Sequence, residues 1–137
     1  MSLELVLWNE ALSKSINKLV DQVDATGPQG IILESSPKKR RYQCIKHGST
    51  GQSKVLIEVT DDEIVRTNQS EAVWLPLILF TIDSVNATTE VDGTLISNPS
   101  GTNGFLTCGL ASDAGWRFVR TNILEHTGDA ITVIVGF

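Results

Sequence analysis

The amino-acid sequence predicts a mainly β protein, in which an N-terminal amphipathic helix precedes an antiparallel β-sandwich of jelly-roll type. Three observations lead to this fold class. Apolar residues recur at helical spacing only near the start of the chain, alternating apolar and polar residues follow from Gly30 onward, and turn-forming residues separate the alternating segments at near-regular intervals. We therefore expect a helix within residues 1–27 and a β-sandwich domain over residues 28–137.

Length and composition place the chain among ordinary globular proteins. Its 137 residues suit one domain, and 41% of them are hydrophobic while 20% are charged. The net charge of −5 argues against binding nucleic acid or anionic lipid over the whole surface. The N-terminus lacks the basic start of a secretory signal, and no apolar run reaches the roughly 20 residues that span a membrane. We therefore expect a soluble protein made in the cytoplasm, with no membrane association.

The helix is predicted over residues 3–23. Ser2 can cap its start, and Gly27 with Pro28 ends it. One face carries an apolar stripe formed by Leu5, Trp8, Leu12, Ile16, Leu19 and Val23. This stripe can either pack on the sheet of its own chain or pair with copies of itself. Because an exposed stripe of this length exceeds what soluble monomers tolerate, we favour self-association through it.

The strands are expected in the following order. The first four are Ile31 to Ser35, Arg41 to His47, Lys54 to Thr60 and Glu63 to Thr67. A long apolar run, Ala72 to Val85, then forms a central strand entered at Pro76, because a proline inside a helix would cost about 3 kcal/mol. A strand this apolar must be covered on both faces. We therefore expect this strand at the centre of the sandwich.

The second half of the chain continues as strands and turns. Asp92-Gly93 predicts a two-residue hairpin turn between Thr88 to Val91 and Thr94 to Ser97. Further strands are predicted over Phe105 to Leu110, Trp116 to Leu124 and Ala130 to Phe137. The predicted core contains Val55, Ile57, Val59, Trp74, Leu77, Leu79, Phe118, Ile131, Val133 and Val135.

One cluster of positive charge stands out. Lys38, Lys39, Arg40 and Arg41 form either a solvated turn, a contact with a partner protein, or, less favoured, a site for nucleic acid. We keep these four residues as a candidate partner contact.

Residue types that carry catalysis are few. His47 and His126 are the two histidines, each beside a glycine-containing turn, and no nucleophile, zinc or phosphate-loop motif accompanies them. Acidic residues at 61–63 and 125–129 are typical of turns, and no cofactor or metal is expected. Cys44 and Cys108 are expected as reduced core residues, with a disulfide as the alternative. The three tryptophans are expected in the core; if exposed, they could form a platform for sugars.

One segment resembles a known group of proteins. Ser36 to Gly48, SPKKRRYQCIKHG, followed by the strand Lys54 to Thr60, is similar to the N/S-P-x-R-R-x-x-x-I-x-N stretch of small β-rich virion proteins of tailed bacteriophages, with His47 where the pattern has Asn. The resemblance implies a non-enzymatic structural protein that decorates a capsid or forms a fibre tip. It also implies a homotrimer in contact with other virion proteins, and no catalytic residues.

Two other functions stay open at this point. A carbohydrate-binding module, which would recognise a glycan on a host surface, is the first alternative, and a small enzyme with a metal-dependent or cupin-like barrel is the second. The loops at residues 48–53, 98–104 and 111–115 are expected to face outward. Exposed aromatic residues beside the loop 98–104 would favour the carbohydrate-binding module, and convergence of His47 and His126 would favour the enzyme.

Overall fold

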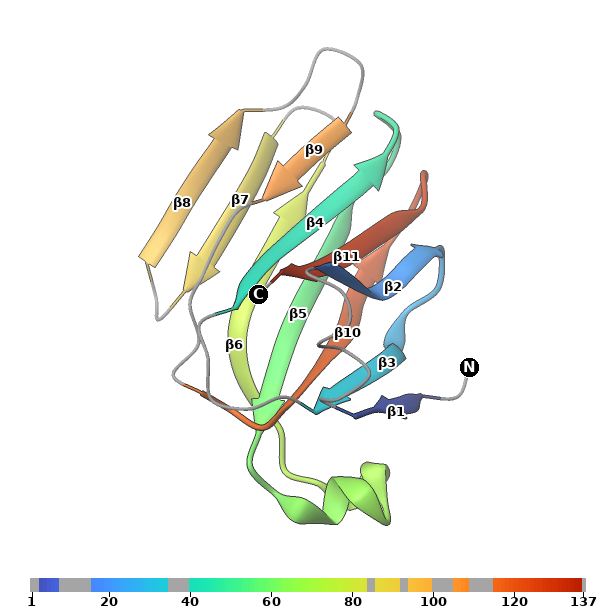
Figure 1. The fold of residues 1–137 in the computed structure, drawn as a ribbon. Helices are drawn as coiled ribbons and strands as arrows, with labels where there is room; N and C mark the ends of the chain where they lie inside the picture. The colour runs from blue at the N-terminus through green and yellow to red at the C-terminus, as the bar shows by residue number, and fades with distance from the viewer. Residues whose placement is uncertain are drawn as a thin grey trace.

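The chain forms two β-sheets, as Figure 1 shows. The computed structural model describes residues 3–7, 16–34, 40–83, 86–91, 94–99, 105–108 and 115–136. Within these ranges lie eleven strands and two short 3₁₀ helices, so the prediction of a mainly β protein is confirmed. No helix in this part of the chain is long and apolar enough to cross a membrane.

The larger sheet has seven strands and the smaller one four. The larger sheet contains, in spatial order, β1 (Glu4–Val6), β3 (Gly27–Glu34), β10 (Phe118–His126), β5 (Ser53–Thr60), β6 (Leu75–Ile82), β7 (Asn86–Val91) and β8 (Thr94–Pro99). The smaller sheet contains β2 (Ile16–Val23), β11 (Ile131–Gly136), β4 (Arg41–His47) and β9 (Phe105–Cys108). Neighbouring strands are antiparallel except β1 and β3, which are parallel.

The predicted N-terminal helix is wrong wherever the structure describes it. Residues 4–6 are strand β1 and residues 16–23 are strand β2, which pairs with β11 at the edge of the smaller sheet. The register between β2 and β11 shifts twice, and the consecutive residues Leu19 and Val20 are both buried. Within β2, this departure from strict alternation accompanies the helix-like spacing of Ile16, Leu19 and Val23. Pairing with a distant strand therefore overrides the local pattern, and the start of the chain belongs to the two sheets.

Both sheets contribute to one hydrophobic core. It includes Leu19 and Val20 of β2, Tyr42 and Cys44 of β4, and the inward residues of β3, β5, β6, β10 and β11. Of the predicted core residues, Val55, Ile57, Val59, Ile131, Val133 and Val135 are buried in this core. Phe118 is buried in a second, smaller cluster, and Trp74 is half-buried against it.

The core residues predicted in β6 are displaced by one position from the residues that are buried. Ile78, Phe80 and Ile82 are buried, whereas Leu77 and Leu79 are only half-buried. The pairing of β6 with β5 changes register where Glu58 lies opposite Pro76 and Ile57 lies opposite Ile78. Leu77 is the extra residue in this bulge, and one extra residue moves every later side chain to the other face.

Two local predictions had opposite outcomes. The hairpin around Asp92-Gly93 is confirmed, because Val91 pairs with Thr94 across a two-residue connection. The strand predicted over Glu63 to Thr67 is wrong, because residues Glu63–Arg66 form the 3₁₀ helix η1. The Asp62 carboxylate accepts a hydrogen bond from the backbone N–H of Ile64, which stabilises a helical turn at this position.

Candidate functional site

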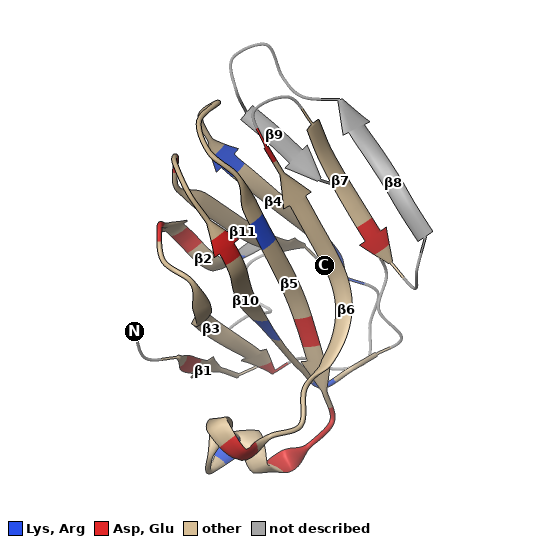
Figure 2. Ribbon diagram, turned by 180° about the vertical axis from the view of Figure 1, so that it is seen from behind, with Lys and Arg blue, Asp and Glu red and all other residues tan. Residues whose placement is uncertain are grey.

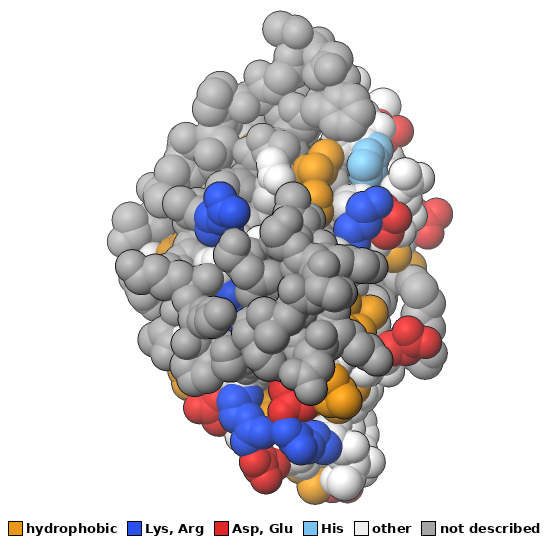
Figure 3. Space-filling model, viewed as in Figure 1, with side chains coloured by type: hydrophobic (Ala, Val, Ile, Leu, Met, Phe, Trp, Pro, Cys, Tyr) orange, Lys and Arg blue, Asp and Glu red, His pale blue; other side chains and the backbone are white. Residues whose placement is uncertain are grey.

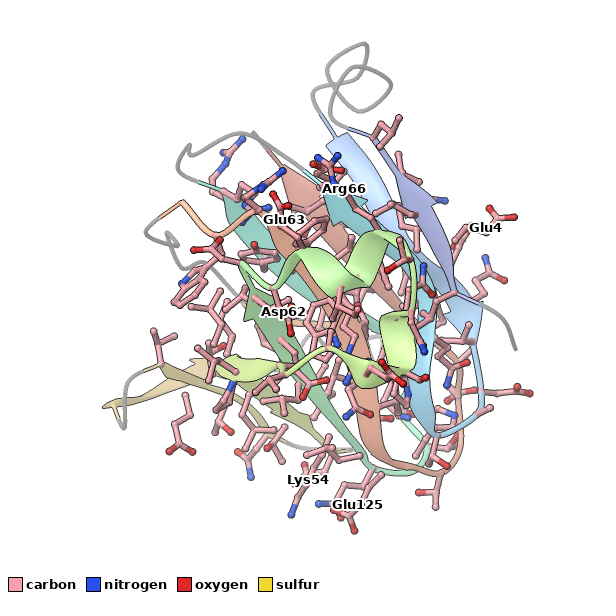
Figure 4. The ribbon with its side chains drawn as sticks, turned by 90° about the horizontal axis from the view of Figure 1, so that it is seen from below. Glu4, Lys54, Asp62, Glu63, Arg66 and Glu125 are labelled. Carbon is pink, nitrogen blue, oxygen red and sulfur yellow. The ribbon has the colours of Figure 1, made fainter. Side chains whose placement is uncertain are left out.

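The segment between β5 and β6, residues 61–74, forms a cap over one end of the larger sheet. It holds η1 (Glu63–Arg66) and η2 (Gln69–Glu71), and Figure 4 shows Asp62, Glu63 and Arg66 on it. The Asp62 carboxylate accepts hydrogen bonds from the backbone N–H groups of Ile64 and Val73, both at 3.2 Å. One side chain therefore ties the start of the cap to its end.

Apolar and ionic contacts hold the cap against the sheet. Val65 is buried with Ile32 and Phe118 in the smaller hydrophobic cluster, which lies on the side of β3 and β10 away from the main core. The apolar contact fixes the position of the cap, and a group of charged residues surrounds it.

This group of charges centres on Glu34 at the end of β3. The Glu34 side chain is only 10% exposed and accepts hydrogen bonds from Arg66 of the cap and from Arg117, the latter at 3.1 Å. Arg117 also donates to Glu63, and this hydrogen bond holds the pKa of Glu63 below its ordinary value. Figure 3 shows positively and negatively charged side chains side by side at the cap end of the molecule.

A second ion pair lies on the same side of the larger sheet. Arg120 of β10 stands directly opposite Glu58 of β5, and its Nε donates to a Glu58 carboxylate oxygen at 2.9 Å. The two side chains are 14% and 12% exposed. The guanidinium also stacks on the indole ring of Trp74, 4.3 Å from its centre. Arg120 is therefore held in one orientation from two sides.

Arg120 borders an open cavity between the sheet and the cap. The cavity has a volume of about 370 Å³, and its lining residues are Leu3, Pro28, Gln69, Ser70 and Arg120. The cap supplies Gln69 and Ser70, the start of β3 supplies Pro28, and Leu3 precedes β1. Arg120, Gln69 and Ser70 provide hydrogen-bond donors and acceptors, and none of these lining side chains is a general base near neutral pH. The arrangement is suited to binding.

The opposite ends of β5 and β10 hold a different polar cluster. The Lys46 ammonium, at the end of β4, is buried and donates to the Ser53 hydroxyl at 2.9 Å and to the carbonyl oxygens of Thr127 and Asp129, each at 2.8 Å. These three bonds use all three ammonium protons. Burial lowers the pKa of Lys46, and the nearby Asp129 carboxylate opposes that shift.

Ser53 connects Lys46 to His126. The Ser53 hydroxyl oxygen accepts a hydrogen bond from Lys46 and lies 2.8 Å from Nδ1 of His126, within hydrogen-bond distance. Burial, followed by the charge of Lys46, lowers the pKa of His126. Because Ser53 is fully buried, a substrate cannot reach its hydroxyl. The cluster therefore joins the two sheets without forming an accessible nucleophile.

The two histidines contact different partners. His47 lies 2.6 Å from the Thr132 hydroxyl, whereas His126 contacts Ser53. Across the described ranges, no three His, Cys, Asp or Glu side chains are grouped so as to hold a metal ion.

The described residues of the predicted oligomerisation stripe lie on strands and do not share one helix face. Leu19 is buried in the core of its own chain, and Leu5 and Val23 are half-buried against the two hydrophobic clusters. Ile16 starts strand β2, while Trp8 and Leu12 lie outside the described residues. The stripe depended on the helix, and Leu19 is not available to a partner.

The candidate basic contact is likewise divided. Arg40 is fully buried, and its guanidinium donates to the carbonyl oxygen of Trp116 at 2.6 Å, so its assignment to a surface contact is wrong. Arg41 is exposed on β4, and Lys38 and Lys39 lie outside the described residues. The basic run therefore includes one buried arginine, which holds the segment before β10 through the carbonyl group of Trp116.

Cys44 is buried in β4, as expected for a core thiol, and forms no disulfide with the residues described. Its register partner across the antiparallel pair of β4 and β9 is Cys108. The sequence spacing of 64 positions gave no indication of this pairing, which is set by the register of β9 on β4.

No family model, no curated protein and no solved structure matches the chain. A function for this chain is therefore inferred from its geometry.

Sequence reasoning overlooked Arg120, Glu58 and Lys46, although a signal for each was present. Lys46 follows Tyr42 and Cys44 at strand spacing on the inward face, and Arg120 and Glu58 each occupy alternating positions within apolar strands.

Proposed function

We propose that this chain is a non-enzymatic structural protein of a virion, made in the host cytoplasm, with a jelly-roll fold. The observation that carries the proposal is the nested pairing of its strands. β2 pairs with β11, β3 with β10, β4 with β9 and β5 with β6, all antiparallel. A double-sheet jelly roll has such an order and is a fold of viral capsid domains and also of lectins and cupins.

The fold alone does not select among these functions. Support for the structural role comes from the resemblance of residues 36–60 to phage virion proteins and from apolar residues left exposed where the cap leads into β6. Val73 is 69% exposed and Leu75 is 43% exposed. We infer that a protein partner covers these two side chains, and that a homotrimer, in contact with other virion proteins, is the functional form.

The molar mass in solution tests this proposal. Light scattering after size-exclusion chromatography should give about 45 kDa, three times the 14.9 kDa of one chain. The double variant Val73→Asp with Leu75→Asp should elute as a folded monomer, with an unchanged circular dichroism spectrum.

The matched control is Gln52→Asp, a change at an exposed residue that precedes β5, whereas the cap follows the other end of that strand. This variant adds one negative charge and should remain trimeric. A wild-type protein that stays monomeric at high concentration would rule out assembly of the chain on its own.

A further inference from the structure

We propose that the cavity between the cap and the larger sheet binds one uncharged sugar residue of a glycan, through Arg120, Gln69 and Ser70. The cavity volume of about 370 Å³ lies within the range of small-ligand sites. This inference does not rest on the proposed trimer, because the argument uses only contacts within one chain.

Arg120 presents a fixed set of donors to the cavity. Its Nε is occupied by Glu58 and its flat face by Trp74, whereas its two terminal nitrogens make no hydrogen bond to any residue that the structure describes. A guanidinium held in this way donates with defined geometry and loses little conformational entropy on binding. Two hydroxyl oxygens on neighbouring carbon atoms suit such a pair of donors.

The cap supplies the complementary groups. The Gln69 amide makes no hydrogen bond to the described residues, so it can both donate and accept. The Ser70 hydroxyl donates to the side-chain oxygen of Asn68 at 2.8 Å, which leaves its oxygen free to accept. Leu3 and Pro28 add apolar surface. A sugar offers the matching combination of hydroxyl groups and C–H faces.

Charge selects a neutral sugar over an acidic one. The Glu58 carboxylate already balances Arg120, and both side chains are less than 15% exposed. A carboxylate or phosphate bound to Arg120 would place a second anion near Glu58 in a poorly solvated site, which is unfavourable. Hydroxyl groups avoid this repulsion.

Nuclear magnetic resonance provides a direct test. Methyl glycosides of glucose, galactose, mannose and N-acetylglucosamine are titrated into the labelled full chain at neutral pH. At least one should cause saturable shifts, with a millimolar Kd, in the signals of the Arg120 Nε–H, the Gln69 side-chain amide and the Trp74 indole N–H. The indole N–H is buried and has no acceptor among the described residues, so it reports on the adjacent arginine.

Variants separate the site from the fold. Arg120→Lys keeps the charge opposite Glu58 but removes the donor pair, and should weaken binding by about 10-fold or more. Gln69→Ala changes a residue of the cap without altering an ion pair and should weaken binding by about 5-fold. The control Gln52→Ala, outside the cavity, should bind like the wild type.

Three results would overturn the inference. One is the absence of saturable shifts with all four glycosides. A second is wild-type affinity in both cavity variants, once their amide spectra show that they are folded. The third is tighter binding of methyl glucuronide or of free sialic acid than of every neutral glycoside, because the site would then be selective for anions.

Discussion

The two ends of strands β5 and β10 are held together by different kinds of polar contact. At the cap end, carboxylates meet guanidinium groups on the side of the larger sheet away from the main core: Glu34 with Arg66 and Arg117, and Glu58 with Arg120. At the other end, the single buried ammonium of Lys46 is bound by neutral oxygens. Figure 2 shows charged residues on the neighbouring strands β5 and β10, whereas β6, on the other side of β5, carries none.

The difference lies in how each charge is stabilised. The arginines at the cap keep contact with water, since the Arg66 and Arg117 side chains are 48% and 34% exposed. Lys46 has no such contact, and its charge depends on the turn at residues 127–129. That turn packs closely on residues 48–52: Gly128 has a φ of 76°, and a Cβ there would lie 2.1 Å from the Thr50 carbonyl oxygen. The buried ammonium therefore depends on close packing, while the charged groups at the cap remain partly hydrated.

Removing the ammonium is expected to have the largest effect on stability. Lys46→Met preserves much of the side-chain volume but leaves the carbonyl oxygens of Thr127 and Asp129 without their donor. We expect the free energy of unfolding in urea to fall by about 3 kcal/mol, because buried acceptors left unsatisfied are costly. The loss should change little between 0.05 and 0.5 M NaCl.

Lys54→Met is the matched control. Lys54 forms an exposed ion pair with Glu125 at 3.1 Å, and its side chain is 40% exposed. Its replacement should change stability by less than about 1 kcal/mol. A loss at Lys46 no larger than the loss at Lys54 would show that the three hydrogen bonds are not what stabilises this end.

The second-largest loss of stability is expected on replacing Glu34. Glu34→Gln removes the carboxylate that two arginines share, and we expect a loss of about 2 kcal/mol. This is less than for a fully buried ion pair, because Arg66 and Arg117 remain partly hydrated. Unlike the loss at Lys46, it should shrink as salt is added.

Glu63→Gln provides the comparison within the same group of charges. Its side chain is 69% exposed, so the expected loss is below about 1 kcal/mol. Equal losses at Glu34 and Glu63, or a Glu34 loss that is insensitive to salt, would contradict the distinction drawn between the two ends.

Much of the β-structure was predictable from the sequence, and the failures share a physical cause. Strand β4 was predicted with its observed bounds, because Tyr42 and Cys44 alternate with polar residues and a glycine turn follows. The hairpin after β7 was predictable because Asp92-Gly93 acts locally. Strand β2 was not, because a shifted register with β11 determines which of its residues are buried. Such a register is a property of two distant segments.

The candidate site was less accessible to sequence reasoning than the fold. Its cavity joins residues from four separate parts of the chain, from Leu3 to Arg120. Arg120 and Glu58 become partners only through the register of β10 on β5. The basic run beginning at Lys38 was the more visible feature, yet Arg40 within it is buried against the carbonyl group of Trp116. Local charge density therefore did not indicate which arginine borders a cavity.

The smallest expected effect is a dependence of stability on pH at the Lys46 end. His126 is half-buried, and burial together with the nearby Lys46 charge lowers its pKa, while Asp24 partly opposes this shift. The unfolded chain therefore binds more protons than the folded one as the pH falls below about 6.5, the ordinary histidine value. The free energy of unfolding should decrease from pH 7.5 to pH 5, a window above the titration of the carboxylates.

His126→Asn tests the origin of this dependence. Asparagine keeps a polar side chain beside Ser53 but does not titrate, so the variant should lose part of the decrease between pH 7.5 and pH 5. His47→Asn is the control, since His47 contacts Thr132 rather than Ser53. Urea unfolding at several pH values measures both. A stability that rises on acidification in the wild type, or an unchanged slope in His126→Asn, would show that burial and Lys46 do not lower the pKa of His126. The contrast between the two ends would then rest on Lys46 alone.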